Sequence, residues 1–106
     1  MKEISIENIT YRIGRNAVDN TQLIKDSDPE WIWFHLDKFP SSHVVVCSND
    51  PDEAMIQTGA SLVKEYSKYK FKNIGINYCK INNLIHGKDA GSVSFVSNKQ
   101  VKIIHI

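Results

Sequence analysis

Two histidines, His35 and His43, flank a turn in the segment WIWFHLDKFPSSH, which covers residues 31–43. If the chain on either side of the turn forms a β-hairpin, the imidazoles come close to opposite each other, at the spacing of about 5 Å typical of cross-strand neighbours. Two imidazoles at that spacing could bind a metal ion, although no motif supplies a third or fourth ligand. They could also act as acid and base on RNA, with Lys38 as the electrophile.

Two simpler interpretations of the histidines stay open. Each imidazole could form a structural hydrogen bond at the end of the sheet, or each could contact RNA directly without catalysis. We therefore expect no metal and no cofactor, and we treat His35, Lys38 and His43 as candidate binding residues.

An arginine and two asparagines follow Gly14, where a strand is predicted to end. Arg15 could bind a phosphate through its forked guanidinium, and Asn16 and Asn20 could hydrogen-bond to phosphate, sugar or base. The alternative is a turn followed by a helix cap, in which these side chains serve the backbone.

Basic and aromatic residues alternate in KEYSKYKFKN, residues 64–73. Lys68, Lys70 and Lys72 could contact a nucleic-acid backbone while the neighbouring rings stack on bases. The same composition is typical of the C-terminal end of an amphipathic helix, where lysines stabilise the helix dipole. The segment alone does not decide between these interpretations.

The strands that would position these residues are predicted from alternation. Residues 31–36 place both tryptophans on the face that carries His35, and we expect Trp33 to be buried under a helix rather than exposed for stacking. A second strand is predicted at residues 43–48, after the turn. Further strands are expected within 4–13 and near 74–80, 91–97 and 101–106, with SNKQ closing a last hairpin.

Two helices complete the predicted fold. The longer covers about 51–69, with Asp50 as N-cap, Pro51 as its first residue and Glu53 completing a capping box. The shorter covers about 20–27, capped by Asp19 or Asn20. The sequence therefore predicts a single α+β domain over residues 1–106, in which a mostly antiparallel sheet of about six strands carries the long helix on one face.

Charge is divided unevenly along the chain. The net charge is +1, but residues 1–53 carry five basic and ten acidic residues, whereas residues 54–106 carry eight lysines and two acidic residues. The second half could present a basic face to a polyanion, or its lysines could only balance the acidic first half.

Several protein classes are disfavoured by composition. No apolar run approaches the roughly 20 residues needed to cross a bilayer, and the N-terminal residues lack the pattern of a signal peptide. Cys47 and Cys79 are isolated, which indicates a reducing compartment. We expect a cytoplasmic protein with no membrane partner.

Four segments, YRIGRNAVDNTQLI, WFHLDKFPSSHVVV, GASLVKEYS and DAGSVSF, occur in this order. Together they resemble the successive motifs of the NFACT-R domain, the RNA-binding module of ribosome-associated quality-control factors and of fibronectin-binding-protein-like relatives. The resemblance covers roughly residues 11–106 and is strongest to the branch found in small eukaryotic coiled-coil proteins. The family commonly has Pro-Gly-Ser-His where this chain reads Pro40-Ser41-Ser42-His43, and Pro-Gly where it reads Ala90-Gly91.

The resemblance implies a stand-alone module that binds RNA, either tRNA or ribosomal RNA, in translation or ribosome quality control. It implies neither catalysis nor the tail-adding activity of full-length factors, whose other domains have no counterpart in this sequence. By resemblance, the site comprises Arg15, Asn16, Asn20, His35 and His43. DNA is an alternative partner, because backbone contacts discriminate poorly between the two nucleic acids.

Other functions remain open at this stage. The domain could be an adaptor that binds a protein on the ribosome, or a histidine-dependent RNA-processing enzyme or metal hydrolase. Strand 101–106 could form an exposed edge and pair with a second copy of the chain as a homodimer.

Overall fold

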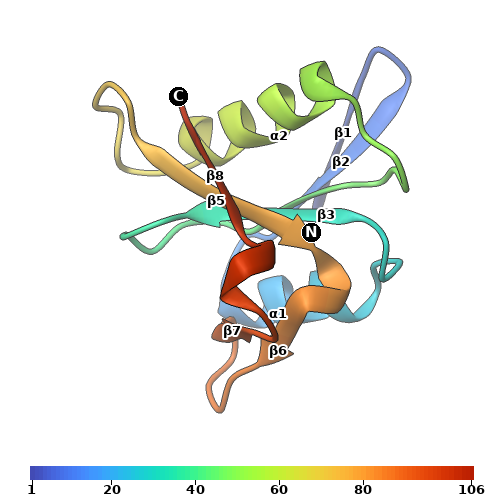
Figure 1. The fold of residues 1–106 in the computed structure, drawn as a ribbon, viewed down its shortest axis with the longest axis vertical. Helices are drawn as coiled ribbons and strands as arrows, with labels where there is room; N and C mark the ends of the chain where they lie inside the picture. The colour runs from blue at the N-terminus through green and yellow to red at the C-terminus, as the bar shows by residue number, and fades with distance from the viewer.

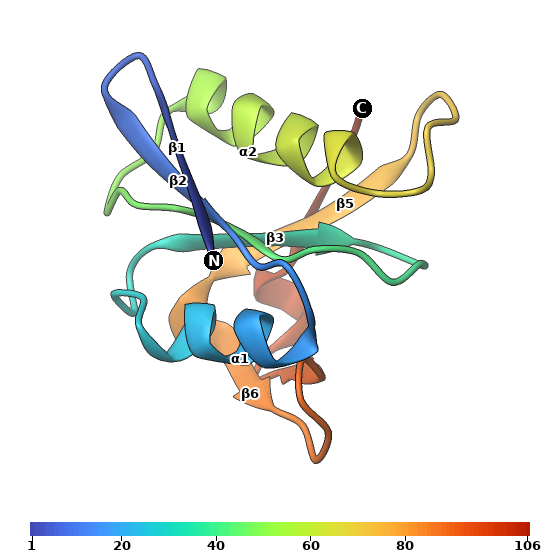
Figure 2. The ribbon, with the colours of Figure 1, turned by 180° about the vertical axis from the view of Figure 1, so that it is seen from behind.

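A six-stranded antiparallel sheet separates two helices in the computed structural model, which describes all 106 residues (Figures 1 and 2). The sheet strands are β1 (Lys2–Ile6), β2 (Ile9–Ile13), β3 (Ile32–Leu36), β4 (Val44–Val46), β5 (Gly75–Lys80) and β8 (Lys102–His105). They lie in the order β1-β2-β4-β3-β5-β8. Helices α1 (Ala17–Lys25) and α2 (Glu53–Glu65) cover opposite faces. The predicted α+β fold is confirmed.

The face under α2 holds the larger apolar cluster. Phe34 and Leu36 of β3 point to this face and pack with Ala60 and Val63 of the helix. Gly59 lets the helix approach, because a Cβ at that position would lie 2.5 Å from Cε1 of Phe34. Because side chains alternate along β3, every second residue of this strand points into this core.

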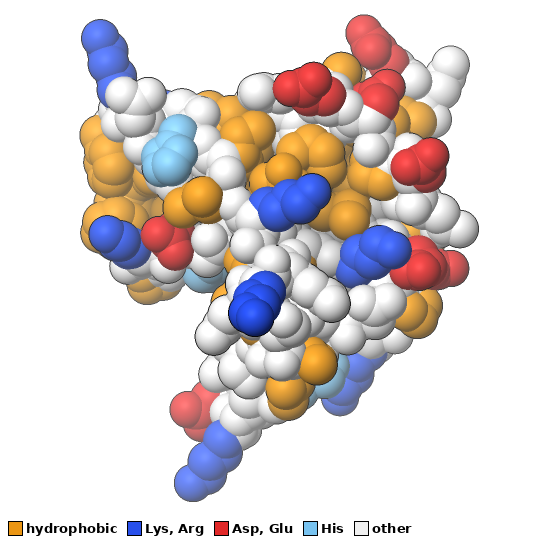
Figure 3. Space-filling view, viewed as in Figure 1, with side chains coloured by type: hydrophobic (Ala, Val, Ile, Leu, Met, Phe, Trp, Pro, Cys, Tyr) orange, Lys and Arg blue, Asp and Glu red, His pale blue; other side chains and the backbone are white.

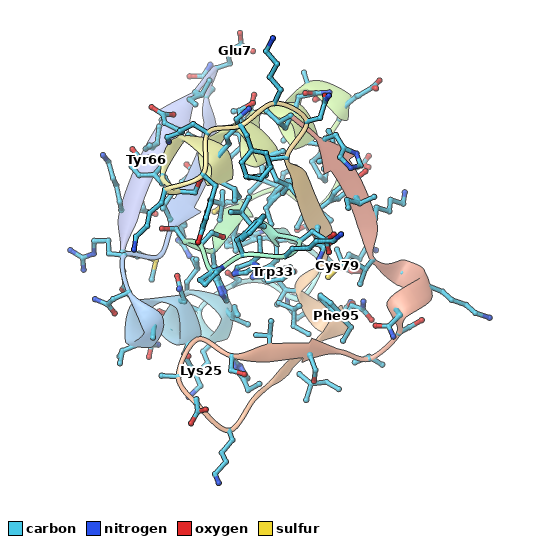
Figure 4. The ribbon with its side chains drawn as sticks, turned by 90° about the vertical axis from the view of Figure 1, so that its left-hand side faces the viewer. Glu7, Lys25, Trp33, Tyr66, Cys79 and Phe95 are labelled. Carbon is cyan, nitrogen blue, oxygen red and sulfur yellow. The ribbon has the colours of Figure 1, made fainter.

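The opposite face is built around Trp33, which is 1% exposed and packs with Leu23 and Ile24 of α1. Its ring also meets Phe95 at a centroid distance of 5.8 Å, and Figure 4 shows the indole between the sheet and the segment that carries Phe95. The prediction that Trp33 belongs to the core is confirmed. His35, two residues further along, extends this face toward the sheet end.

The last third of the chain differs from the prediction. Residues 81–83 form the short 3-10 helix η1 (Ile81–Asn83), and β6 (Leu84–His86) pairs only with β7 (Val93–Phe95) in a separate two-stranded sheet. The predicted strand 91–97 is therefore not part of the main sheet. The predicted closing hairpin is also wrong, because η2 (Asn98–Gln100) intervenes and β8 pairs with β5.

A buried asparagine explains this departure. Asn83 is 2% exposed, and its side chain donates to the carbonyl of Ser97 at 3.0 Å and accepts from the Ser97 N–H at 2.9 Å. The two bonds hold the start of β6 next to the end of β7 and so fold the β6–β7 hairpin away from the sheet. The hairpin then reaches α1, where the Gly91 N–H donates to Thr21 Oγ1 at 2.7 Å.

Both helices begin and end at other residues than predicted. The N-cap of α2 is Asp52, whose carboxylate accepts from the Met55 N–H at 2.9 Å, so Asp50 and Pro51 precede the helix. The helix ends at Glu65 rather than near residue 69, because the Ser67 hydroxyl and the Lys70 ammonium bond the carbonyl of Lys64.

The shorter helix is displaced toward the N-terminus. Asn16 caps α1 by accepting from the Asp19 N–H at 2.9 Å, which agrees with the helix-cap alternative for the residues after Gly14. The prediction that Asp19 or Asn20 caps the helix is wrong. The helix therefore covers Ala17–Lys25 instead of 20–27. Neither helix of the protein has the length and apolar character that a membrane span requires.

Strand β8 is an edge of the sheet, as the sequence predicted for residues 101–106. Ile103 on this edge is 48% exposed. Pairing of this edge with a second copy stays a prediction.

The close contact between Gly59 and Phe34 yields a stability prediction. In Gly59→Ala the added methyl group meets a fully buried ring, and we expect this overpacking to cost about 1–3 kcal/mol. After the helix-propensity gain of about 1 kcal/mol is subtracted, the free energy of unfolding should fall by up to about 2 kcal/mol. Urea denaturation measures the change, and Ser61→Ala, at an exposed position of the same helix, is the matched control. An increase in stability for Gly59→Ala would contradict the packing described here.

Candidate nucleic-acid interface

A polar cavity of about 460 Å³ lies where the start of α1, the β3–β4 turn and the segment after α2 meet. Five residues predicted for the site line it together: Arg15, Asn16, Asn20, His35 and His43. Lys68 is the sixth predicted residue at this cavity, which the hairpin residues Ala90 and Gly91 also border. The structure thus brings together residues that lie far apart in the sequence.

The two histidines face each other as the hairpin interpretation predicted. Phe34 of β3 pairs with Val44 of β4, so the same register places His35 across from His43 at the end of the ladder. Their ring centroids are 4.9 Å apart, and the ring planes are almost perpendicular at 86°.

His43 is held from two directions. Its Nδ1 accepts a hydrogen bond from the indole N–H of Trp33 at 3.1 Å, and its backbone N–H donates to Asn20 Oδ1 at 3.2 Å. The residue is 2% exposed. Burial, reinforced by the neighbouring His35, lowers the pKa of His43 to about 3, so its imidazole is neutral near neutral pH.

His35 is half-buried and anchored through its own backbone region. Its Nδ1 lies 2.6 Å from the carbonyl oxygen of Leu36, and its ring stacks parallel to the indole of Trp33 at a centroid distance of 5.7 Å. Burial lowers the pKa of His35, against the smaller opposing effect of the hydrogen bond to Leu36. Both imidazoles therefore favour their neutral forms.

Asn20 is a buried connector rather than an exposed side chain. It is 7% exposed and packs so tightly on Gly14 that a Cβ there would lie 1.8 Å from Asn20 Oδ1. Glycine is required at position 14 for this contact, which joins α1 to the end of β2. The sequence assigned Asn20 to the ligand or to a helix cap, and the structure shows that it orients the backbone of His43.

Arg15 is organised by Asp19, a residue that the sequence considered only as a helix cap. Its carboxylate accepts from both the backbone N–H of Arg15 at 2.9 Å and the Arg15 guanidinium Nε at 3.1 Å. The backbone hydrogen bond is the main cause that lowers the pKa of Asp19 to about 2. The Arg15 side chain stays 66% exposed, and its terminal nitrogens are free to meet a ligand. The four-residue spacing of Arg15 and Asp19 is the signal that could have identified the pair.

The predicted lysines separate into different places. Lys68 is exposed at the cavity, whereas Lys70 donates to the carbonyls of Lys64 and Glu65 at the end of α2. Lys72 is exposed but does not line the cavity. Lys38 borders a second cavity of about 300 Å³, which also includes Phe39 and Phe71.

Aromatic rings lie between the two cavities. Tyr69 lines the polar cavity, Phe39 lines the second, and their rings stack at a centroid distance of 4.4 Å. Phe71 packs edge-on against Phe39 at 5.8 Å and remains 50% exposed. Exposed rings of this kind can stack on nucleic-acid bases.

A broad basic face does not form on the side of the molecule shown in Figure 3. There the Lys and Arg side chains lie apart from one another, while acidic side chains gather near the β1–β2 turn and the start of α2. Some lysines of the basic second half serve internal contacts instead: Lys64 donates to the carbonyl of Ile106, and Lys80 pairs with Glu30.

The geometry differs from the acid–base interpretation of the sequence. A general base works best when its pKa lies near the working pH, and the pKa of His43 is far below it. Lys38, the electrophile of the catalytic interpretation, borders the other cavity. Nowhere in the chain do three or more His, Cys, Asp or Glu side chains gather in a way that could hold a metal ion.

Comparison with known proteins places the chain in a family. Residues 2–99 match the model of the NFACT protein RNA binding domain. The chain belongs to this family. It is 35% identical over 108 residues to coiled-coil domain-containing protein 25 of Danio rerio, an alignment that covers 92% of this chain and 52% of that protein. It is also 31% identical to the Rqc2 homolog RqcH of Bacillus subtilis, covering 92% of this chain and 18% of the relative.

A solved structure supports the fold independently. The C-terminal part of the fibronectin/fibrinogen-binding protein from Streptococcus suis superposes with a TM-score of 0.87, covering 98% of this chain and 44% of that one at 20% identity. The chain spans about half the length of the coiled-coil relatives it matches. The match therefore concerns one NFACT-R domain within longer proteins.

The buried histidine pair predicts sensitivity to acid. The pKa of His43 is lower in the folded protein than the ordinary 6.5, so the unfolded chain binds the additional proton as the pH falls from 6.5 toward about 3. Stability is therefore lost in this window, by up to about 1.4 kcal/mol per pH unit for each such proton. Lowering of the pKa of His35 adds to the effect.

The measurement is the free energy of unfolding in urea at several pH values between 3.5 and 7, in roughly half-unit steps. We expect a shallower pH dependence for His43→Gln than for the native chain. The matched control is His86→Gln, which replaces an exposed histidine of β6 outside the cavity. Equal slopes for the native chain and His43→Gln would contradict a neutral, buried His43.

Proposed function

We propose that this domain binds RNA through the polar cavity, with tRNA or ribosomal RNA as its target. The observation that carries the proposal is the convergence of Arg15, His35, His43 and Lys68 on one cavity. These residues come from four separate segments, and the fold of an RNA-binding domain family gathers them. The match to Rqc2 homologues supports a role in ribosome quality control.

The charges of the cavity suit a nucleic-acid backbone at its rim. Arg15 and Lys68 are both exposed, and the Arg15 guanidinium is oriented by Asp19 while its terminal nitrogens stay open. A guanidinium presented in this way can form two parallel hydrogen bonds to one phosphate. Phosphate contact at the rim would position the strand over the histidines.

The aromatic residues beside the cavity favour an unpaired segment of RNA. Tyr69 of the polar cavity stacks on Phe39 of the second cavity, which Phe71 and Lys38 also line. A single strand could place its phosphates at Arg15 and Lys68, stack a base on the exposed ring of Phe71 and continue toward Lys38. Single-stranded loops and ends are the segments of RNA whose bases are free to stack in this way.

Because Arg15 and Lys68 are cations at the rim, we expect RNA affinity to depend on salt and to fall when either residue is replaced. We expect Arg15→Ala and Lys68→Ala each to weaken tRNA binding roughly fivefold to tenfold at low salt and to reduce the slope of log affinity against log salt by about one. Filter binding or fluorescence anisotropy at two salt concentrations measures both effects. The matched control is Lys25→Ala, at the opposite end of α1 from the cavity (Figure 4).

Two outcomes would contradict the proposal. The first is the absence of any tRNA binding by the native chain, even at low salt. The second is a loss of affinity in Lys25→Ala as large as in Arg15→Ala, which would indicate attraction by overall charge rather than by the cavity. Circular dichroism of each variant confirms that the fold is retained.

A further inference from the structure

The hydrogen bonds of the two histidines fix where each ring carries its proton. An indole N–H can only donate, so Nδ1 of His43 is an acceptor and the proton of the neutral ring is on Nε2. A carbonyl oxygen can only accept, so Nδ1 of His35 holds the proton and its Nε2 has a free lone pair. The pair is therefore one donor and one acceptor, set side by side.

Both Nε2 atoms retain some accessible surface at the cavity. Neither forms a hydrogen bond within the protein, and every fully buried side-chain nitrogen or oxygen atom of the chain has a partner. His35 and His43 must therefore expose these atoms, and the cavity is the surface that both of them line. The ring centroids are 4.9 Å apart, so one small polar group can lie against both rings.

The charged side chains of the cavity lie apart from the two neutral imidazoles. Arg15 and Lys68 are exposed at the rim, whereas His43 is 2% exposed and His35 is half-buried at the floor. Only a small group that projects from a bound strand can reach such a floor. A phosphate oxygen is unsuited to it, because the lone pair on His35 Nε2 would face a second acceptor.

We infer that the His35–His43 pair binds a ribose 2′-hydroxyl and so distinguishes RNA from DNA. The hydroxyl oxygen accepts from His43 Nε2–H, and its hydrogen is donated to His35 Nε2. A 2′-hydroxyl is both donor and acceptor, and it is the group that marks RNA at a given position. A deoxyribose would leave both imidazole nitrogens without a partner, at a cost in affinity. This inference rests on the proposed function and specifies what the cavity recognises.

The test compares three labelled strands with the same bases and phosphates by fluorescence anisotropy: oligouridine, oligodeoxyuridine and 2′-fluoro-oligouridine. We expect the native chain to bind oligouridine roughly tenfold more tightly than oligodeoxyuridine, the effect of one to two hydrogen bonds. The 2′-fluoro strand keeps the sugar shape of RNA but cannot donate, so it should bind as weakly as the deoxy strand.

A variant assigns the preference to the histidines. His35→Phe keeps a ring that can stack on Trp33 but removes the acceptor. We expect it to lose the preference for oligouridine, mainly through weaker binding of that strand. His86→Phe makes the same substitution at an exposed histidine outside the cavity and should keep the preference.

The outcomes separate this inference from the proposed function. Equal affinity of the native chain for oligouridine and oligodeoxyuridine overturns the inference alone, as does tight binding of the 2′-fluoro strand or an equal loss for both strands in His35→Phe. Binding of tRNA without binding of oligouridine also overturns it, because the hydroxyl would then not be read from a single strand. If the native chain binds neither tRNA nor any of the three strands, the proposed function is overturned, and the inference with it.

Discussion

The hydrogen bond from the Trp33 indole to the His43 imidazole joins the core of the domain to its cavity. Trp33 is fixed by the apolar residues of α1 and by Phe95, so the direction of its N–H is set by packing. A buried indole N–H without a partner would cost about 1–3 kcal/mol, and His43 supplies that partner. The same contact decides the tautomer of His43, and with it the donor that faces the cavity. Stability and the proposed recognition therefore depend on one pair of side chains.

Other contacts around the cavity also both stabilise the fold and position a residue that lines it. Asn20 packs on Gly14 and accepts from the backbone of His43, which joins α1, β2 and β4 at one point. Asp19 holds the start of α1 and orients the guanidinium of Arg15. On the other side, the β6–β7 hairpin is tied to α1 by the bond from Gly91 to Thr21. The cavity is thus a preformed product of the fold, and a ligand needs to order little besides itself and the exposed side chains at the rim.

Alternation along β3 and the hairpin interpretation predicted the geometry at the centre of the candidate site. Alternation placed Trp33 and His35 on the same face, and pairing across the turn placed His35 opposite His43. Local helix signals were less reliable. Asp50 and Asp52 both precede the α2 pattern, and only the backbone geometry at Asp52 selects the cap. Similarly, the type of Asn20 suits a cap or a ligand, and its burial against Gly14 depends on a contact between separate elements.

The lysines show the limit of composition as a guide. Lys68 and Lys70 are two residues apart and equally basic, but one faces the cavity and the other satisfies the last carbonyls of α2. The side chain of Lys70 takes part in ending the helix, together with the Ser67 hydroxyl, whereas that of Lys68 does not. Likewise, the separate β6–β7 sheet follows from the paired bonds between Asn83 and Ser97, a long-range interaction with no local signature.

Within the cavity, the charged rim and the neutral floor suit different tasks: the rim suits affinity for a polyanion, and the floor suits selectivity. Cations at the rim act at long range and are screened by salt, whereas hydrogen bonds at a neutral, buried floor are short-ranged and respond weakly to ionic strength. Burial keeps the imidazoles uncharged, so they add little to the general attraction for polyanions and instead respond to the shape and hydrogen-bonding pattern of what reaches them. A pair of charged histidines in the same place would attract any phosphate and lose this distinction. The packing that buries His43 therefore has two effects. It lowers the pKa of the imidazole, and it leaves a neutral ring that can form a selective hydrogen bond.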